Sequence, residues 1–199
     1  MTEIRKTNKH TRIPQSRIMY RIIAFALGNP LRRLTMNPVN VLTKMGIQKG
    51  LTVLEVGCGP GFFTIPAARI VEECNVYALD LSPLMIENVK KKVKKQRLNN
   101  VKTITATASN TGLEDESIDL IFCIDVLSDI TDIDSTLQEM YRILKFDGIL
   151  SVFEPHTGFE PGAWKPDKSI KELTATGLFS LHARDDRILK FKKVARHAD

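Results

Sequence analysis

The chain has 199 residues, of which 43% are hydrophobic and 26% are charged, and its formal net charge is +6. This composition is typical of one soluble globular domain and excludes a disordered, collagen-like or disulfide-stabilised chain. Its apolar runs, such as residues 22–27, are far shorter than the ~20 residues of a membrane-spanning helix. The first residues lack the apolar segment of a secretion signal, and the three cysteines have the spacing of neither a disulfide framework nor a metal site. We therefore expect reduced thiols and a cytoplasmic location.

The N-terminal region is the most basic part of the chain. Residues 1–50 carry ten basic and one acidic side chain, whereas residues 51–150 carry ten basic and fifteen acidic ones. A basic arm on an acidic body can contact nucleic acid, an anionic membrane surface or an anionic substrate. For residues 1–12, a solvated arm without such a partner is the plainer interpretation.

An amphipathic helix is predicted from Gln15 to Leu27, where apolar residues recur at helical spacing. So many apolar positions need a partner, and we expect the helix to pack on the domain as a lid. Binding to a membrane surface is the alternative. We divide the chain into residues 1–37, the basic arm and lid helix, and residues 38–199, the main domain.

The main domain alternates strand-like and helical patterns, which is typical of β-α-β units and a parallel sheet. A short helix begins at Pro38 and ends before Gly46. A cap at Ser82 and a proline at position 83 predict the start of another helix. Two further helices are expected over residues 62–73 and 133–144. The strands are predicted over residues 52–56, 76–80, 101–106, 118–124 and 148–154, all parallel, and over residues 178–183 and 187–194, a hairpin turning at Arg184-Asp185-Asp186.

The most informative segment runs from the first strand into the next helix and reads Val53-Leu54-Glu55-Val56-Gly57-Cys58-Gly59-Pro60-Gly61. Glycines let the backbone approach a ligand, and the loop lies at the carboxyl edge, where open α/β sheets bind their ligands. The dinucleotide pattern G-x-G-x-x-G is not met, because Phe62 occupies the position of its third glycine. Glu55 would repel a pyrophosphate but attract a cation. S-adenosylmethionine, which bears an ammonium and a sulfonium, is such a ligand.

The glycine segment resembles motif I of the class I S-adenosylmethionine-dependent methyltransferases, E/D-x-G-x-G-x-G. Asp80 stands 19 residues beyond the last glycine, where the family has an acid that accepts both ribose hydroxyls. Residues 139–148 are similar to the E-x-x-R-x-L-K-P-G-G of the type 11 subfamily, which resembles quinone-biosynthesis and other small-molecule methyltransferases. Phe146 and Asp147 replace the proline and the first glycine of that pattern, a change expected to alter only a turn.

The resemblance covers about residues 38–155. It implies an α/β fold with a Rossmann-like, seven-stranded, mostly parallel sheet, a C-terminal antiparallel hairpin and helices on both faces. It also implies S-adenosylmethionine as cofactor. Thr107 departs from the family, which commonly has Asp at this position to bind the adenine amino group; its hydroxyl carries no charge, so neighbouring residues up to Asn110 could share this contact. The expected cofactor-binding residues are Glu55, Gly57, Cys58, Gly59, Gly61, Asp80, Leu81, Thr107, Ala108, Ser109 and Asp125.

Methyl transfer is a displacement at an activated sulfonium, so the protein must align the acceptor and sometimes remove its proton. Weak candidates for that role follow the fourth and fifth strands at the cofactor edge. They are Asp125, Ser128, Asp129, Glu154 and His156, each of which could also be an ordinary loop residue. The lid helix and the insert over residues 156–171, with Trp164, are expected to shape the acceptor pocket.

The function expected from the sequence is methyl transfer to a small-molecule acceptor. RNA methylation guided by the basic arm and a non-catalytic cofactor-binding regulatory module are the alternatives. Nucleic acid is a less favoured partner, because residues 122–127 lack the N/D-P-P-Y/F pattern of amino-methylating enzymes and the lysines of residues 90–95 suit a solvated helix face. A Mg²⁺ site in the acidic residues 125–134 is a minor alternative, and no metal is expected.

Overall fold

The computed structural model describes residues 36–153, 166–185 and 187–195. The predicted lid helix and residues 156–165 of the predicted insert, with Trp164, lie outside the described residues. The boundary proposed between residues 37 and 38 falls at the first described helix, α3 (Pro38–Met45).

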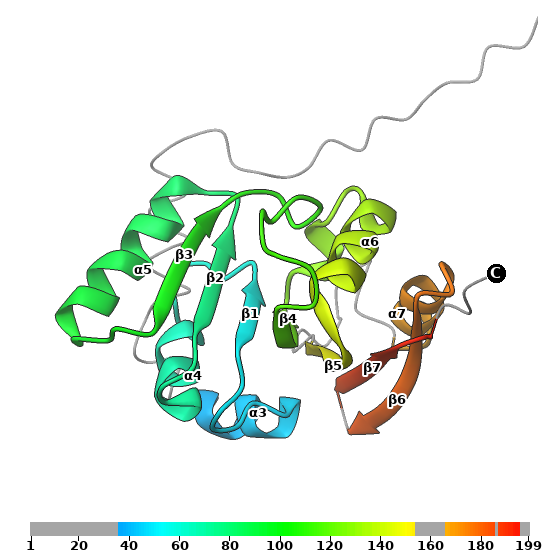
Figure 1. The fold of residues 1–199 in the computed structure, drawn as a ribbon, viewed down its shortest axis with the longest axis horizontal. Helices are drawn as coiled ribbons and strands as arrows, with labels where there is room; N and C mark the ends of the chain where they lie inside the picture. Colours follow the sequence, from blue (N-terminus) through cyan, green and yellow to red (C-terminus); the bar gives the residue numbers. More distant parts are fainter. Residues whose placement is uncertain (1–35, 154–165, 186, 196–199) are drawn as a thin grey trace, which may run out of the picture.

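A seven-stranded sheet forms the centre of the molecule, in the order β3-β2-β1-β4-β5-β7-β6 (Figure 1). The first five strands pair in parallel, and β7 pairs antiparallel with both β5 and β6. The fold expected from the sequence is therefore confirmed. The strands are β1 (Val53–Val56), β2 (Val76–Asp80), β3 (Val101–Thr105), β4 (Ile118–Ile124), β5 (Leu144–Phe153), β6 (Phe179–Asp185) and β7 (Ile188–Lys193).

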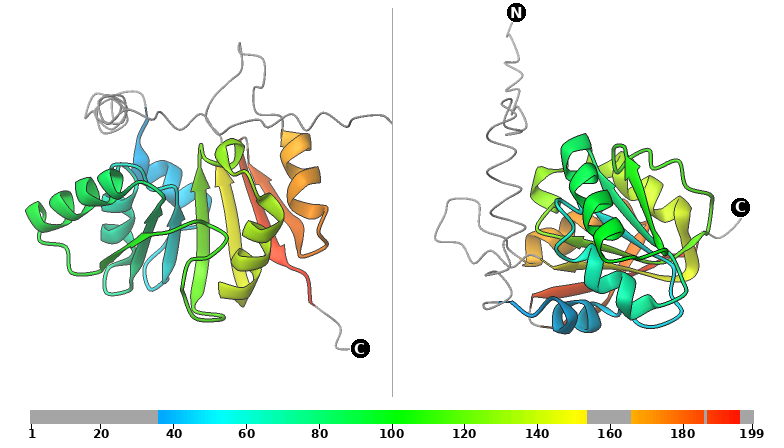
Figure 2. Two further views of the ribbon diagram at one scale, coloured as in Figure 1. Left: turned by 90° about the horizontal axis from the view of Figure 1, so that it is seen from above. Right: turned by 90° about the vertical axis from the view of Figure 1, so that its left-hand side faces the viewer.

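Helices cover both faces of the sheet (Figure 2). On one face, α3 and α4 (Thr64–Val71) share a cluster of buried side chains with β1 and β4, while α5 (Pro83–Lys95) packs on β2. On the other face lie α6 (Ile133–Ile143) and α7 (Pro166–Thr174). A 3-10 turn, η1 (Leu127–Asp129), follows β4. Both faces of the central strands are thus shielded, which a parallel sheet requires.

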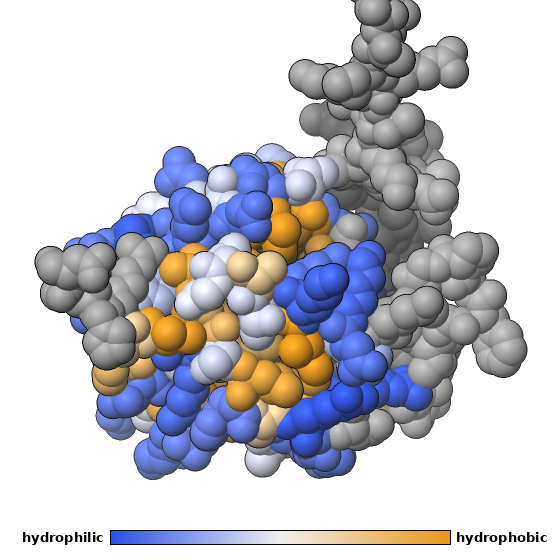
Figure 3. All heavy atoms as spheres, turned by 90° about the vertical axis from the view of Figure 1, so that its right-hand side faces the viewer, coloured by the Kyte–Doolittle hydropathy of each residue, from blue (hydrophilic) through white to orange (hydrophobic). Residues whose placement is uncertain are grey.

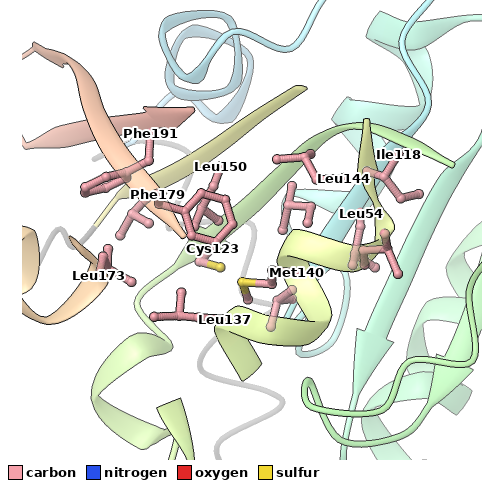
Figure 4. Close-up of a cluster of buried hydrophobic side chains, with 14 of the residues drawn as sticks. Leu54, Ile118, Cys123, Leu137, Met140, Leu144, Leu150, Leu173, Phe179 and Phe191 are labelled. Carbon is pink, nitrogen blue, oxygen red and sulfur yellow. The ribbon is translucent and has the colours of Figure 1, made fainter. Parts of the chain in front are cut away.

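The larger core cluster lies between the sheet and helices α6 and α7 (Figure 4). Leu137 and Met140 of α6 meet Cys123 of β4, while Phe179 and Phe191 of the hairpin meet Leu173 of α7. Each of these side chains is at most 2% exposed. The hairpin strands are therefore bound into the core and are not a peripheral appendage.

The local signals at α3 act as expected. Asn37 accepts hydrogen bonds from the backbone N–H groups of Val39 and Asn40, and Gly46 ends the helix with a φ of 102°. The expectation at Ser82 is only partly confirmed: it occupies the N-cap position of α5, but its side chain makes no capping hydrogen bond. Instead, its backbone N–H donates to Asp80.

Three local features differ from what the sequence led us to expect. The helix α7 begins in the segment that we expected to be an insert at the acceptor pocket, where we predicted no helix. Phe146 and Asp147 lie within β5, which begins at Leu144, so they belong to a strand and not to a turn. The hairpin turns later than expected, because Arg184 and Asp185 still belong to β6.

The outer strand β6 is exposed along nearly its whole length. Polar side chains can therefore point to solvent within the strand, and Arg184 and Asp185 continue it instead of forming the turn. Figure 3 looks onto this side of the molecule and shows hydrophobic residues exposed among hydrophilic ones. Leu181, which is 40% exposed, is one of the large apolar side chains that the described surface leaves accessible. Within the described ranges, no helix combines the length and apolar character needed to cross a bilayer.

Candidate functional site

The glycine loop connects β1 to α4 and is held against β2. The backbone N–H groups of Gly57 and Cys58 both donate to the carbonyl oxygen of Leu79 at 2.9 Å. Gly57 has a φ of 72°, and a Cβ at this position would lie 2.5 Å from Val126 Cγ2, so no side chain fits. Gly59 also has a positive φ, of 51°, but faces open space. The loop therefore combines a rigid anchor with a surface that a ligand can approach.

Asp80, the last residue of β2, joins two loops at the carboxyl edge. Its Oδ2 accepts a hydrogen bond from Gly59 N at 2.9 Å, and its Oδ1 accepts one from Ser82 N at 2.8 Å. Burial raises the pKa of this carboxyl group, and the two backbone donors oppose the rise. Each carboxylate oxygen has two lone pairs, so each can accept one more hydrogen bond from a ligand hydroxyl.

Glu55 is a buried acid in the middle of β1, with 3% of its surface exposed. Thr64, at the start of α4, donates its hydroxyl hydrogen to Glu55 Oε2 at 2.5 Å. Burial raises the pKa of Glu55 to about 8, because the charged form loses water; Asp80 adds to the rise, and the Thr64 hydrogen bond opposes it. Near pH 7 this carboxyl group is mostly protonated, and a ligand cation beside it would favour ionisation.

Cys58 lies between these acids and is not a nucleophile. Its side chain is 5% exposed, and burial followed by the charges of Glu55 and Asp80 raises the pKa of its thiol. A thiol needs a lowered pKa to be reactive. Cys58, Cys74 and Cys123 are all free in the structure.

The loop after β3 forms the third part of the edge. Asn110 N donates to the carbonyl oxygen of Thr107 at 3.2 Å, and Ser109 Oγ donates to Thr107 Oγ1 at 3.2 Å, so these residues form a turn. Ala108 packs on the core cluster and anchors the turn. On the neighbouring loop Leu81 is 58% exposed, which leaves an apolar surface at the same edge.

The end of β4 supplies the fourth part. Asp125 has a φ of 57°, an uncommon conformation for a residue other than glycine, and its N–H donates to the carbonyl oxygen of Phe153 at 3.0 Å. Asp129 lies in η1, where burial and the charge of Asp125 raise its pKa. Ser128 belongs to the same turn, but its side chain is outside the described part. Glu154 and His156 lie outside the described residues.

Because β3, β2, β1 and β4 are parallel neighbours, their carboxyl ends place all four loops along one edge of the sheet. Within the described ranges no cluster of three or more His, Cys, Asp or Glu side chains suits a metal ion. A cavity of about 590 Å³ lies elsewhere, lined by residues at the amino ends of β4 and β5, including Asp119, Lys145 and Phe146. The candidate residues are therefore gathered at an edge that this cavity does not reach.

Sequence reasoning missed two features of the site. Thr64, the partner of Glu55, gave no signal beyond a hydroxyl at the start of a helix. Glu139 and Arg142 were noted only as part of a family pattern, yet both contact the loop after β3. A glutamate followed three residues later by arginine on a predicted amphipathic helix was the available signal for an ion pair.

Known proteins that this chain resembles are described as methyltransferases. Residues 47–190 match the profile of a family described as a methyltransferase domain. Demethylmenaquinone methyltransferase of Geobacillus stearothermophilus is 36% identical over 116 residues, covering 58% of this chain and 50% of that protein. The enzyme of the same name from Listeria welshimeri is 34% identical over 148 residues, covering 74% of this chain and 60% of that protein. The chain thus spans about half to three fifths of the length of these curated relatives.

A solved structure with a similar fold is a S-adenosylmethionine-dependent methyltransferase from Aquifex aeolicus. It superposes with a TM-score of 0.77 at 22% identity, covering 87% of this chain and 98% of that one. Coclaurine N-methyltransferase bound to N-methylheliamine and S-adenosylhomocysteine aligns with a TM-score of 0.52 at 25% identity, covering 57% of this chain and 34% of that one. With the family profile matching well over half of its length, the chain belongs to the methyltransferase domain family of class I S-adenosylmethionine-dependent enzymes.

Proposed function

We propose that the protein transfers the methyl group of S-adenosylmethionine to a small-molecule acceptor and releases S-adenosylhomocysteine. The observation that carries the proposal is the joining of Glu55, the glycine loop and Asp80 at one edge of the sheet. The carboxyl group of Glu55 would ionise beside an ammonium group. The loop is open at Gly59, so an aliphatic chain can lie close to its backbone. Asp80 has lone pairs left to accept hydrogen bonds from the two hydroxyls of a ribose.

The roles of the individual residues are part of this proposal. Glu55 attracts the ammonium group, and Asp80 accepts hydrogen bonds from the ribose hydroxyls. Exposed Leu81 covers one face of the adenine ring, and the turn from Thr107 to Ser109 contacts its edge. The backbone of Gly57, Cys58, Gly59 and Gly61 lines the methionine part, and Asp125 closes the site beside it.

When bound, S-adenosylmethionine supplies a methyl group on an activated sulfonium, which a nucleophilic atom of the acceptor displaces. The chain's part is to hold the acceptor in line and to exclude water. If the acceptor must lose a proton, the raised pKa of Asp129 makes this residue the first general base to test, and Asp125 is the second. Ser128, Glu154 and His156 remain weaker candidates for contacts to the acceptor.

The names of the curated relatives make demethylmenaquinone the first acceptor to test. RNA methylation and cofactor binding without turnover are the alternative outcomes. A cytoplasmic location, the division at residue 38 and a lid role for the helix predicted over residues 15–27 are further parts of the proposal, each with a test of its own.

The test has two steps. Calorimetry with S-adenosylhomocysteine and with NAD should show saturable binding of the first alone. Turnover is then measured with radiolabelled cofactor and soluble demethylmenaquinone analogues, metabolite extracts or RNA. Asp80→Ala should weaken cofactor binding, whereas Asp147→Asn, which changes an exposed acid on β5, should not. Saturable binding of NAD without a response to S-adenosylhomocysteine would refute the proposal, and binding without turnover on any acceptor would favour the regulatory module.

A further inference from the structure

Two charged side chains of α6 hold the loop that follows β3. Glu139 is 9% exposed, and its Oε1 accepts hydrogen bonds from Thr111 N at 2.9 Å and from Thr111 Oγ1 at 2.6 Å. The guanidinium of Arg142 donates to both oxygens of the same carboxylate, each at 2.8 Å. Four donors therefore converge on one buried acid, a strong form of charge-assisted hydrogen bonding.

Arg142 extends the contact along the loop. Its second terminal nitrogen also donates to the carbonyl oxygen of Leu113 at 2.7 Å, and its backbone carbonyl accepts from Glu116 N at 3.0 Å. It forms an ion pair with Asp115 as well. The Asp115 carboxylate is 75% exposed, so we expect this ion pair alone to add little to the stability of the loop. Residues 111–116 are thus tied to α6 at four positions.

The loop has little internal structure to hold its shape. Residues 106–117 contain no helix, and the turn from Thr107 to Asn110 is closed by one backbone hydrogen bond of 3.2 Å. Thr111 follows that turn directly. Its two hydrogen bonds to Glu139 therefore fix the end of the segment to which the proposed function assigns the adenine contact.

We propose that Glu139 and Arg142 are positioning residues for adenine recognition, acting through Thr111 on the turn from Thr107 to Asn110. The inference rests on the proposed function. Hydrogen-bonding sites discriminate between similar ligands only when their donors and acceptors are held in place. The uncharged Thr107 makes this requirement stricter, because no carboxylate is present there to attract the adenine amino group over a range of loop positions.

Glu139 keeps its negative charge, and Arg142 its positive charge, at every pH at which the protein would be assayed. The hydrogen bonds from Arg142, followed by those from Thr111, lower the pKa of Glu139 to about 2 despite its burial. The preference for adenine should therefore not change through titration of Glu139 between pH 5 and pH 9. Glu55, in contrast, is expected to titrate within this range.

The experiment compares S-adenosylhomocysteine with S-inosylhomocysteine, in which a carbonyl oxygen replaces the adenine amino group. The ratio of their dissociation constants reports recognition of the base edge, because the two ligands differ only there, in the exocyclic group and in N1, which carries a hydrogen beside the carbonyl group. Thr111→Val removes one donor to Glu139, and Arg142→Met removes the guanidinium. The matched controls are Thr111→Ser, which keeps the hydroxyl, and Lys145→Met, which removes a neighbouring cation paired with Asp119 at 2.7 Å near the opposite edge.

We expect Thr111→Val and Arg142→Met to lower the preference for S-adenosylhomocysteine by about tenfold, equivalent to the loss of one hydrogen bond. The ratio should stay at the parental value in Thr111→Ser and Lys145→Met. An unchanged ratio in a folded Thr111→Val protein would overturn the inference, as would an equal fall in Lys145→Met. If the parent binds neither ligand, the proposed function itself fails, and this result is distinct from binding without a change of preference.

Discussion

The buried acid Glu55 predicts a link between pH, stability and cofactor affinity. Its folded pKa of about 8 lies above the ordinary 4.5. In the unfolded chain the group ionises from about pH 4.5 upwards, while in the free folded protein it stays protonated until about pH 8. A raised folded pKa contributes stability that is fully present below pH 4.5 and is lost as the pH rises through 8, at up to about 1.4 kcal/mol per pH unit. Near pH 7 the loss is on the order of 3 kcal/mol.

The cofactor ammonium favours the ionised form, so affinity for S-adenosylhomocysteine should rise with pH. Between pH 6 and pH 7, where most of the group is still protonated, the expected rise approaches tenfold, and binding at pH 7 should release close to one proton. Calorimetry in two buffers of different ionisation enthalpy counts that proton. Glu55→Gln should bind more weakly at pH 8, lose the pH dependence, and unfold at higher denaturant concentration than the parent at the same pH.

Thr64 provides the matched pair for this experiment. Its hydroxyl stabilises the charged carboxylate, so Thr64→Val should raise the pKa of Glu55 further and shift the rise in affinity to higher pH, whereas Thr64→Ser should keep the parental profile. The reasoning is wrong if the parent binds with pH-independent affinity, or if Glu55→Gln retains the parental slope.

Three further predictions follow from the other parts of the site. Asp80→Ala should weaken S-adenosylhomocysteine binding by about 1.5 to 3 kcal/mol, measured by calorimetry, whereas Thr107→Asp should not weaken it; parental affinity in the first variant would show that ribose is bound elsewhere. Gly57→Ala should destabilise the fold by at least about 1 kcal/mol in denaturant titrations, because its methyl group meets Val126 at a positive φ, and an unchanged midpoint would contradict that clash. Hydrogen exchange across residues 13–28 should slow when S-adenosylhomocysteine binds; unchanged exchange, with unchanged binding after deletion of residues 1–30, would refute the lid.

Local sequence signals predicted those elements whose ends are marked by particular residues. For α3, the sequence carries both a start signal, Pro38, and a stop signal, Gly46. The strands β2 and β4 are apolar runs whose observed bounds equal the predicted ones. The helix α7 was missed because it buries little more than Leu173 and Ser169, and two buried positions do not establish a helical period. The end of β6 was misplaced because polar residues on an exposed edge strand look like a turn.

The site shows a different limit, which is the distance along the chain between interacting groups. The glycine loop and Asp80 could be predicted to lie together because the loop follows β1 and Asp80 ends β2, at the same edge of the sheet. The bond from Thr111 to Glu139 joins residues 28 positions apart, and no local pattern indicates which loop an acid on α6 will meet. Sequence reasoning identified both segments and left their contact to the structure.

The acids of the site divide into two kinds according to whether the protein supplies their partners. Glu139 has its cation in Arg142, so its pKa falls and its charge helps to hold the structure. Glu55 is buried with a hydroxyl and no cation among its described partners, so its pKa rises and ionisation costs the fold stability. A buried acid of the second kind is better explained by a cation from outside the chain, since a glutamine of similar size would satisfy Thr64 without that cost. The difference between these two acids is therefore itself an argument that the glycine edge is built for a cationic ligand.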